Sequence, residues 1–219
     1  MPVKIESREY RKIDATLMET RKQDDGAMIV EGYATTFNQP YELWRDKNMI
    51  VNEQVDAQAF AETDMEDTIM QYDHEGRVFA RVKNGTLQLD PDEHGLKVTA
   101  NLGGTEIGRQ LFEEIQGGYT TKMSFGFTVT GEKSQRSKDD NGNTVILRTI
   151  TKIGRLYDVS AVSLPANDAT EISSRSIGDG LIAEVQKEVL AEEERQRKEQ
   201  QILEIRKLLN MEDENHEDA

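Results

Sequence analysis

The sequence predicts a mainly β protein with flanking helices. Short segments of alternating apolar and polar residues recur at near-regular spacing, turn signals rich in glycine, asparagine and proline separate them, and only two helical stretches interrupt them. The strand–helix rhythm of a doubly wound parallel sheet is absent, and no internal repeat is visible. About eight strands of this kind are typical of an antiparallel barrel or a sandwich.

The first elements are the least regular. Residues 3–25 are polar with scattered apolar positions, which is typical of an edge strand or an arm. Residues 27–37 and 49–55 are strand candidates, and Trp44 between them lies in a polar segment that we expect to be a loop. Residues 56–67 are predicted to form a short helix with an aspartate N-cap.

The middle of the chain contains clearer turn signals. Residues 68–72 are expected to be extended. Residues 77–82 and 86–89 are predicted to pair as a hairpin around Asn84-Gly85, and residues 95–102 form the next strand. The clearest helix of the body follows, because a threonine cap, an apolar stripe and a terminal glycine pair succeed one another. These features are Thr105, then Ile107, Leu111, Phe112 and Ile115, then Gly117-Gly118.

The next strand, residues 122–129, is the most informative stretch. Its apolar residues alternate with small or polar ones, so we expect a half-buried strand with the hydroxyl of Ser124 facing outward. Gly126 lies next on that face, where a missing side chain lets another group approach the backbone. A long hairpin with a charged loop at residues 132–143 should follow, and then a last strand at residues 152–165.

Charge separates the C-terminal part from the rest. Residues 177–219 have 13 acidic and 6 basic side chains, so they account for -7 of the net charge of -15. Residues 177–211 are helical in composition, but residues 192–199 contain no apolar side chain, which excludes a continuous coiled coil. We therefore divide the chain into an arm (1–26), a body (27–176) and an acidic helical tail (177–219), with residues 212–219 expected to be disordered.

Composition excludes several classes of protein. The negative charge disfavours nonspecific nucleic-acid binding. The chain has no cysteine, so disulfides and thiolate chemistry are absent. Its apolar runs are too short to span a membrane and its start lacks a signal-peptide core, so we expect a soluble protein. The histidines lie far apart (His74, His94 and His216), and no phosphate loop or G-x-S-x-G elbow occurs, so neither a metal nor a cofactor is expected.

Three residues are interesting together. His74 follows a short strand, Ser124 lies on the strand described above, and Asp158 interrupts an apolar stretch in which a carboxylate must be paired. Together they would supply the hydroxyl, imidazole and carboxylate of a serine–histidine–aspartate triad. The alternatives are a turn histidine, a solvent-facing serine and an aspartate that pairs with Arg155 or a backbone amide.

Six short stretches follow one another in an order that characterises a known family. They are Glu31-Gly32-Tyr33-Ala34, Tyr72-Asp73-His74-Glu75, Ala80-Arg81-Val82, Gly117-Gly118, Met123-Ser124-Phe125-Gly126-Phe127 and the run from Asp158 to Asn167. In this order they resemble the maturation (prohead) serine proteases of tailed bacteriophages, which are related to the herpesvirus assemblin proteases. The chain departs from the family pattern where it has Asp73, Glu75, Ala80, Gln58 and Asp158, but no departure removes a reactive group.

The resemblance implies a closed antiparallel β-barrel of the assemblin type and a role for each residue. Ser124 would attack the scissile carbonyl, His74 would move its proton, and Asp158 would orient the imidazole. Asp73 and Glu75 are alternative third members, although residues adjacent to His74 do not easily reach its far ring nitrogen. Candidates for stabilising the oxyanion are backbone amides near Gly126, and Arg81 directly or through water.

The resemblance also implies a setting. The family acts in the host cytoplasm inside the assembling procapsid, where it removes the scaffolding segment of the major capsid protein and often cleaves itself. Expected partners are therefore that protein and its scaffolding segment, with possible portal or scaffold contacts, and a homodimer or higher oligomer by analogy. The tail would hold the protease among scaffold helices, or it is a solvated helix without a partner. A catalytically silent scaffold or assembly protein is the alternative function, and an ordinary β-barrel binding module with an oligomerisation helix is a third.

Overall fold

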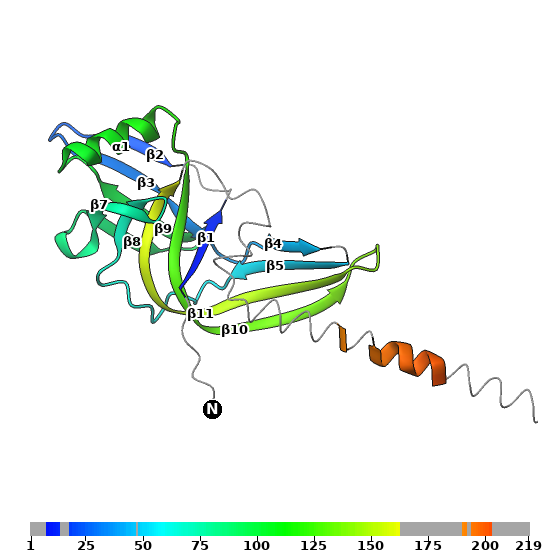
Figure 1. Ribbon diagram of the computed structural model, residues 1–219. Coiled ribbons are helices and arrows are strands. Elements are labelled where there is room, and N and C mark those ends of the chain that lie inside the picture. The colour runs from blue at the N-terminus through cyan, green and yellow to red at the C-terminus, as the bar shows by residue number, and fades with distance from the viewer. Residues whose placement is uncertain (1–7, 14–17, 47, 163–189, 192–193, 203–219) are drawn as a thin grey trace, which may run out of the picture. The chain divides into compact units, whose positions relative to one another are not determined.

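The computed structural model describes residues 8–13, 18–46, 48–162, 190–191 and 194–202. Up to residue 162, the described chain folds into strands with one α-helix and one short 3-10 helix (Figure 1), which confirms the mainly β prediction. The elements are β1 (Glu9–Ile13), β2 (Glu19–Lys22), β3 (Met28–Thr36), β4 (Tyr41–Asp46), β5 (Met49–Val55), β6 (Ile69–Tyr72), β7 (Glu75–Arg81), η1 (Val82–Asn84), β8 (Leu87–Pro91), β9 (Gly95–Asn101), α1 (Glu106–Gln116), β10 (Lys122–Lys138) and β11 (Thr144–Val162).

The described strands form two sheets. Four strands pair in the order β2-β3-β9-β8, and seven belong to a larger sheet with the order β1-β10-β11-β5-β4, in which β11 also pairs with β6 and β6 with β7. β1 and β2 end their sheets, so the edge-strand alternative for residues 3–25 applies to both.

The larger sheet is mixed. β11 runs parallel to β5 over its first half and parallel to β6 near its end, so a purely antiparallel arrangement is wrong for these pairs. The length of β11 explains this, because one long strand can offer different parts of the same edge to two shorter ones (Figure 1).

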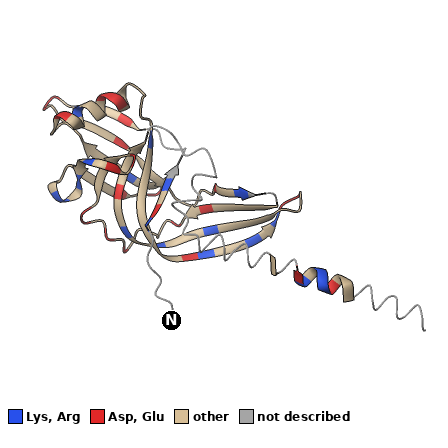
Figure 2. Cartoon of the chain, in the orientation of Figure 1, with Lys and Arg blue, Asp and Glu red and all other residues tan. Residues whose placement is uncertain are grey.

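The β10–β11 hairpin is longer than predicted. Residues 132–138, expected in a loop, continue β10, and the chain turns only between Asp139 and Asn143. Charges of both signs lie along this outer part (Figure 2). An ion pair between Glu132 and Arg148 joins the two strands there, a cross-strand contact of a kind that stabilises pairing.

Residues of β10 alternate between its two faces as predicted, but the face that carries Ser124 is not exposed to solvent. Met123, Phe125 and Phe127 are fully buried in the core, as expected. Ser124 is also 0% exposed, so the expected outward-facing hydroxyl is wrong. The reason is tertiary, since His74 and the neighbouring strand β1 both contact this hydroxyl.

α1 confirms the helix predicted at residues 105–116. It begins after Thr105, whose hydroxyl accepts a hydrogen bond from the amide of Gly108 at 3.1 Å, and it ends at Gly117. Its buried face includes Leu111 and Phe112, which pack into a core shared with both sheets. Local capping and the apolar stripe are therefore sufficient to define this element.

The helix predicted at residues 56–67 is wrong, because this segment forms successive turns. Its backbone makes short turn bonds, such as the amide of Ala59 donating to the carbonyl of Asp56 at 2.9 Å, and it also bonds to β11. The amide of Ile153 donates to the carbonyl of Ala59 at 2.9 Å, and the hydroxyl of Thr63 donates to the carbonyl of Ile153 at 2.9 Å. A helix of this length is marginal alone, so contacts with β11 decide the conformation.

Two further local predictions are wrong. Gly85 has the expected positive φ of 72°, but it ends the 3-10 turn η1, while β7 pairs with β6 and β8 with β9. The Asn-Gly signal therefore marks the turn and not the strand partners. Trp44, expected in a loop, lies on β4, which pairs with β5.

Contacts divide the chain into two units, Met1–Ser176 and Ile177–Ala219. In the second unit the structure describes residues 190–191 and 194–202, all helical, with exposed side chains. The remainder of the predicted tail helix, the 212–219 segment and the end of the last predicted strand lie outside the described residues. No described helix has the length and apolar character needed to cross a membrane.

Candidate active site

His74 lies at the tip of the hairpin between β6 and β7. Tyr72 pairs with Glu75, so Asp73 and His74 are the two central residues of the turn, with φ values of 46° and 62°. Positive φ at both positions is the requirement of a type I′ hairpin turn. Residues without glycine's freedom keep such angles where their surroundings hold them, and this often occurs at functional sites. The imidazole contacts side chains of β10 and β11.

Three side chains meet through this imidazole. His74 Nε2 lies 2.5 Å from Ser124 Oγ, and His74 Nδ1 lies 2.5 Å from Asp158 Oδ1. A proton on Nδ1, donated to the carboxylate, leaves the lone pair of Nε2 directed at the hydroxyl. The arrangement can take a proton from Ser124 and stabilise the resulting imidazolium, which is what nucleophilic catalysis requires.

Asp158 is fully buried and satisfied by several partners. Ser160 Oγ donates to Asp158 Oδ1 at 2.9 Å, and the backbone amide of His74 donates to Ser160 Oγ at 3.2 Å. Arg8 forms an ion pair with the other carboxylate oxygen. Ser160 was missed by the sequence reasoning, although its position two residues after Asp158 on one strand places both on the same face.

The structure separates the remaining candidates from the imidazole. Asp158, and not Asp73 or Glu75, is the carboxylate on Nδ1 of His74. Arg81 forms a two-point ion pair with Asp67, at 2.5 and 2.6 Å, and makes no hydrogen bond to the triad within the described chain.

Gly126 lies opposite Asp158 in the β10–β11 ladder. A Cβ atom on Gly126 would lie 2.5 Å from Asp158 Oδ2. Its missing side chain therefore makes room for the Asp158 carboxylate, which contacts His74. This carboxylate is the group that approaches the backbone at Gly126, where the sequence predicted a close approach.

Comparison with known proteins identifies the family. A family profile described as Caudovirus prohead serine protease matches residues 16–181 of this chain. The chain belongs to the caudovirus prohead serine protease family. A solved structure, "Structure of the bacteriophage T4 capsid assembly protease, gp21", aligns with 71% of this chain and 98% of its own, at 8% identity and a TM-score of 0.38. No curated protein matches the sequence significantly, and the assignment rests on the family profile.

In this member of the family, β1 and the residue before it together contact all three of Ser124, His74 and Asp158. The carbonyl of Arg11 accepts a hydrogen bond from Ser124 Oγ at 2.7 Å. The ring of Tyr10 lies edge-on to His74 with 4.5 Å between centroids, and Arg8 pairs with Asp158. No local sequence signal indicated these contacts, because they depend on pairing between segments more than a hundred residues apart.

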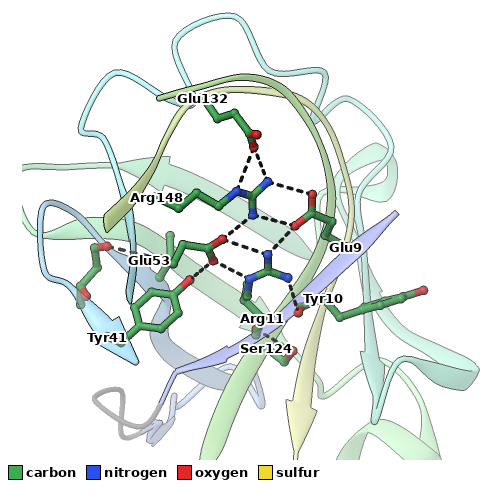
Figure 3. A network of polar contacts seen from close by, with 10 residues as sticks. Glu9, Tyr10, Arg11, Tyr41, Glu53, Ser124, Glu132 and Arg148 are labelled. Atoms are coloured by element: carbon green, nitrogen blue, oxygen red, sulfur yellow. Dashed lines mark hydrogen bonds and ion pairs between the residues drawn. The ribbon is translucent and has the colours of Figure 1, made fainter. Parts of the chain in front are cut away.

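A buried charge network begins on β1 at Arg11, whose carbonyl contacts Ser124 (Figure 3). Arg11 Nε donates to Glu53 Oε1 at 2.5 Å and Arg11 Nη2 to Glu53 Oε2 at 2.9 Å. Arg148 and the hydroxyl of Tyr41 also contact Glu53, and Arg148 forks onto Glu9 at 3.0 and 3.1 Å. Among the described residues, no group of three or more acidic, histidine or cysteine side chains is placed to hold a metal ion.

The network sets the charge of Glu53. Burial alone would raise the pKa of this carboxyl, but the Arg11 cation, its hydrogen bond and Arg148 outweigh burial and lower the pKa to about 2 from 4.5. Burial likewise opposes the charge of Arg11, yet the attraction of Glu53 raises its pKa. Both groups therefore stay ionised at neutral pH.

The pH dependence of stability should reveal this shift. A depressed folded-state pKa stabilises the protein above pH 4.5, and this contribution is lost as pH falls toward 2. The parent chain should therefore lose on the order of 3 kcal/mol of unfolding free energy across that window, and the Glu53→Gln variant should not. Urea unfolding at a series of pH values measures the difference. Glu62→Gln, at an exposed pair with Lys152, is the control, and parallel curves for Glu53→Gln and the parent would contradict the prediction.

Proposed function

We propose that this chain is a serine endopeptidase of procapsid maturation. Ser124 attacks the scissile carbonyl, His74 takes the hydroxyl proton and returns it to the leaving amine, and Asp158 holds the tautomer and stabilises the imidazolium. The observation that carries this proposal is the continuous contact from Asp158 through both ring nitrogens of His74 to Ser124. Water then hydrolyses the acyl-enzyme.

The oxyanion needs donors beside Ser124. Backbone amides near Gly126 remain the first candidate. Arg81 remains the second, directly or through water, although its ion pair with Asp67 must then rearrange. A closed β-barrel of the assemblin type also belongs to this proposal, with the parallel pairs of β11 retained.

The proposed substrates are the scaffolding segment of the major capsid protein and the chain itself. Family membership supports a place inside the assembling procapsid in the host cytoplasm. Portal or scaffold contacts and a homodimer or higher oligomer complete the proposal, with no nucleic-acid, membrane or cofactor role. The acidic tail would hold the enzyme among scaffold helices until cleavage.

One observation favours a second function. Ser124 is fully buried, and its hydroxyl contacts a backbone carbonyl of β1. A catalytically silent assembly protein that keeps the protease fold would tolerate such a closed site.

Co-expression with the cognate capsid protein separates the two functions. We expect intact mass spectrometry to detect shortened capsid protein with the parent chain and none with Ser124→Ala. Ser134→Ala, at an exposed position on the same strand, is the matched control and should behave like the parent. If Ser124→Ala gave the same fragments as the parent, the peptidase assignment would be refuted. Intact capsid protein in every sample would favour the catalytically silent assembly protein.

A further inference from the structure

β1 lies where a peptide strand would bind. It ends the larger sheet and pairs there with β10, antiparallel, with Lys12 opposite Ser124 in the register. Without β1, the edge of the strand that carries the nucleophile would be open, and an open sheet edge is a template for an extended peptide. The family profile begins at residue 16, so β1 lies outside the matched region.

The backbone of β1 presents a peptide carbonyl to the nucleophile. Ser124 Oγ lies 2.7 Å from the carbonyl oxygen of Arg11 and 2.5 Å from His74 Nε2. A hydroxyl has one proton, and the proton given to Arg11 is not available to His74. β1 therefore resembles a bound peptide while keeping Ser124 in an unreactive arrangement.

Two side chains also contact the triad, namely Tyr10 of β1 and Arg8, which precedes the strand. Arg8 pairs with Asp158, and its guanidinium repels the imidazolium that attack would generate on His74. Tyr10 packs against the imidazole. Arg8 Nε is buried without a hydrogen-bond partner among the described residues, a cost that departure of β1 would remove. A strand that merely completed a sheet would not need this set of contacts.

The opposite face of β1 enters the buried charge network. Alternation along the strand places Glu9 and Arg11 on one face, where Arg11 contacts Glu53 and Glu9 contacts Arg148 (Figure 3). Both β1 side chains are buried, with 2% of Arg11 and 9% of Glu9 exposed. The body therefore recognises two charges of opposite sign at a fixed spacing along an extended strand.

The charges left on the body define what can replace β1. Glu53 and Glu132 are acidic and Arg148 is basic, so this set has an excess of one negative charge. Glu53 has an ion-pair partner in Arg148 but would lose the two hydrogen bonds from Arg11. A cation in the position of Arg11 restores these contacts, whereas an anion there would face a buried carboxylate.

We propose that the edge of β10 binds an extended peptide segment with a basic residue at the carbonyl facing Ser124 and an acidic residue two positions before it. β1, with Glu9 and Arg11, is the chain's own copy of that segment and closes the site until another strand displaces it. Glu53 selects the basic residue, and Arg148 selects the acidic one. This substrate class rests on the proposed peptidase function, although binding itself does not require catalysis.

Peptide binding tests the proposal without cleavage. The probe is a fluorescent peptide with the sequence of residues 8–13, and the matched probe has glutamate in place of arginine at the position of Arg11. Full-length Ser124→Ala is compared with the same chain also bearing Arg11→Gln, by fluorescence anisotropy. We expect at least tenfold tighter binding to the doubly substituted chain, because its own strand competes less, and at least tenfold weaker binding of the glutamate peptide.

A second loosening variant guards against misfolding. Tyr10→Ala, also in the Ser124→Ala chain, weakens β1 from the triad face and leaves the charge network intact, and circular dichroism checks each fold. Glu53→Gln, added to the Arg11→Gln chain, should reduce the discrimination between the two peptides. Equal affinity for both peptides, or no binding to either loosened chain, overturns the proposal.

Labelling of Ser124 by a fluorophosphonate links binding to chemistry. With Ser124 intact, Arg11→Gln should be labelled at least tenfold faster than the parent. If the parent and Arg11→Gln were labelled at equal rates and the two peptides bound equally, this inference would be overturned but the proposed peptidase function would stand. If the two peptides bound with different affinities but no variant were labelled, the binding site would be supported and the proposed peptidase function would be refuted.

Discussion

Replacing Asp158 with asparagine is expected to slow peptide-bond cleavage by roughly 10³–10⁴-fold while the chain still folds. The carboxylate now accepts from His74 Nδ1 and from Ser160 Oγ. An amide nitrogen turned toward the ring would donate to Nδ1, which forces the proton onto Nε2. Nε2 could then no longer accept the proton of Ser124. The loss is therefore one of tautomer more than of position.

Asp73→Asn is the matched control. Asp73 precedes His74 in the turn with a positive φ of 46°, and asparagine tolerates that conformation well, so the turn should persist. Cleavage of the capsid protein, followed by intact mass over time, should be nearly unchanged. Full activity in Asp158→Asn together with loss in Asp73→Asn would assign the third position to the residue beside the histidine.

Side-chain chemistry made much of the site predictable. A carboxylate inside an apolar strand needs a partner, and this requirement singled out Asp158. The order of short motifs then linked it with His74 and Ser124. The structure brings these three together, because β10 and β11 are neighbours and the β6–β7 turn lies against them.

Elements that depend on distant pairing were not predictable from local signals. The capped helix α1 is defined by adjacent residues, and its prediction is confirmed. By contrast, the conformation of residues 56–67 depends on hydrogen bonds to β11, and β7 pairs with β6 instead of β8. Local propensity is a weak preference there, and tertiary hydrogen bonds override it.

The burial of Ser124 illustrates the same limit. The alternation of β10 correctly placed Ser124 on the face opposite Phe125, but the occupant of that site comes from the other end of the chain. β1 is short and polar, and its position depends on contacts with distant residues, since Arg11 lies between Ser124 and Glu53. Recognition of a charged strand by a buried charge network has no local sequence signature.

Gly126→Ala should reduce cleavage by roughly 10²-fold or more, because small misplacements of catalytic groups are costly. The added Cβ would lie 2.5 Å from Asp158 Oδ2 and 2.8 Å from Tyr10 Cε1. Tyr10 can move with its edge strand, but the carboxylate must rotate to escape. That rotation breaks its alignment with His74 Nδ1. Cleavage rates and thermal unfolding, measured on the same preparation, separate lost alignment from lost folding.

Gly131→Ala on the same strand provides the matched control. Its Cβ would lie 3.0 Å from Lys152 Cβ, so the strands of the outer hairpin must shift by a few tenths of an ångström, but none of its nearest atoms belongs to the triad. Neither glycine has a positive φ, so alanine adds no backbone strain in either case. Parent-like cleavage by both variants would show that Asp158 has room to move without losing His74. Loss of cleavage confined to Gly126→Ala would mean that the missing side chain of Gly126 is required to hold the Asp158 carboxylate in line with His74.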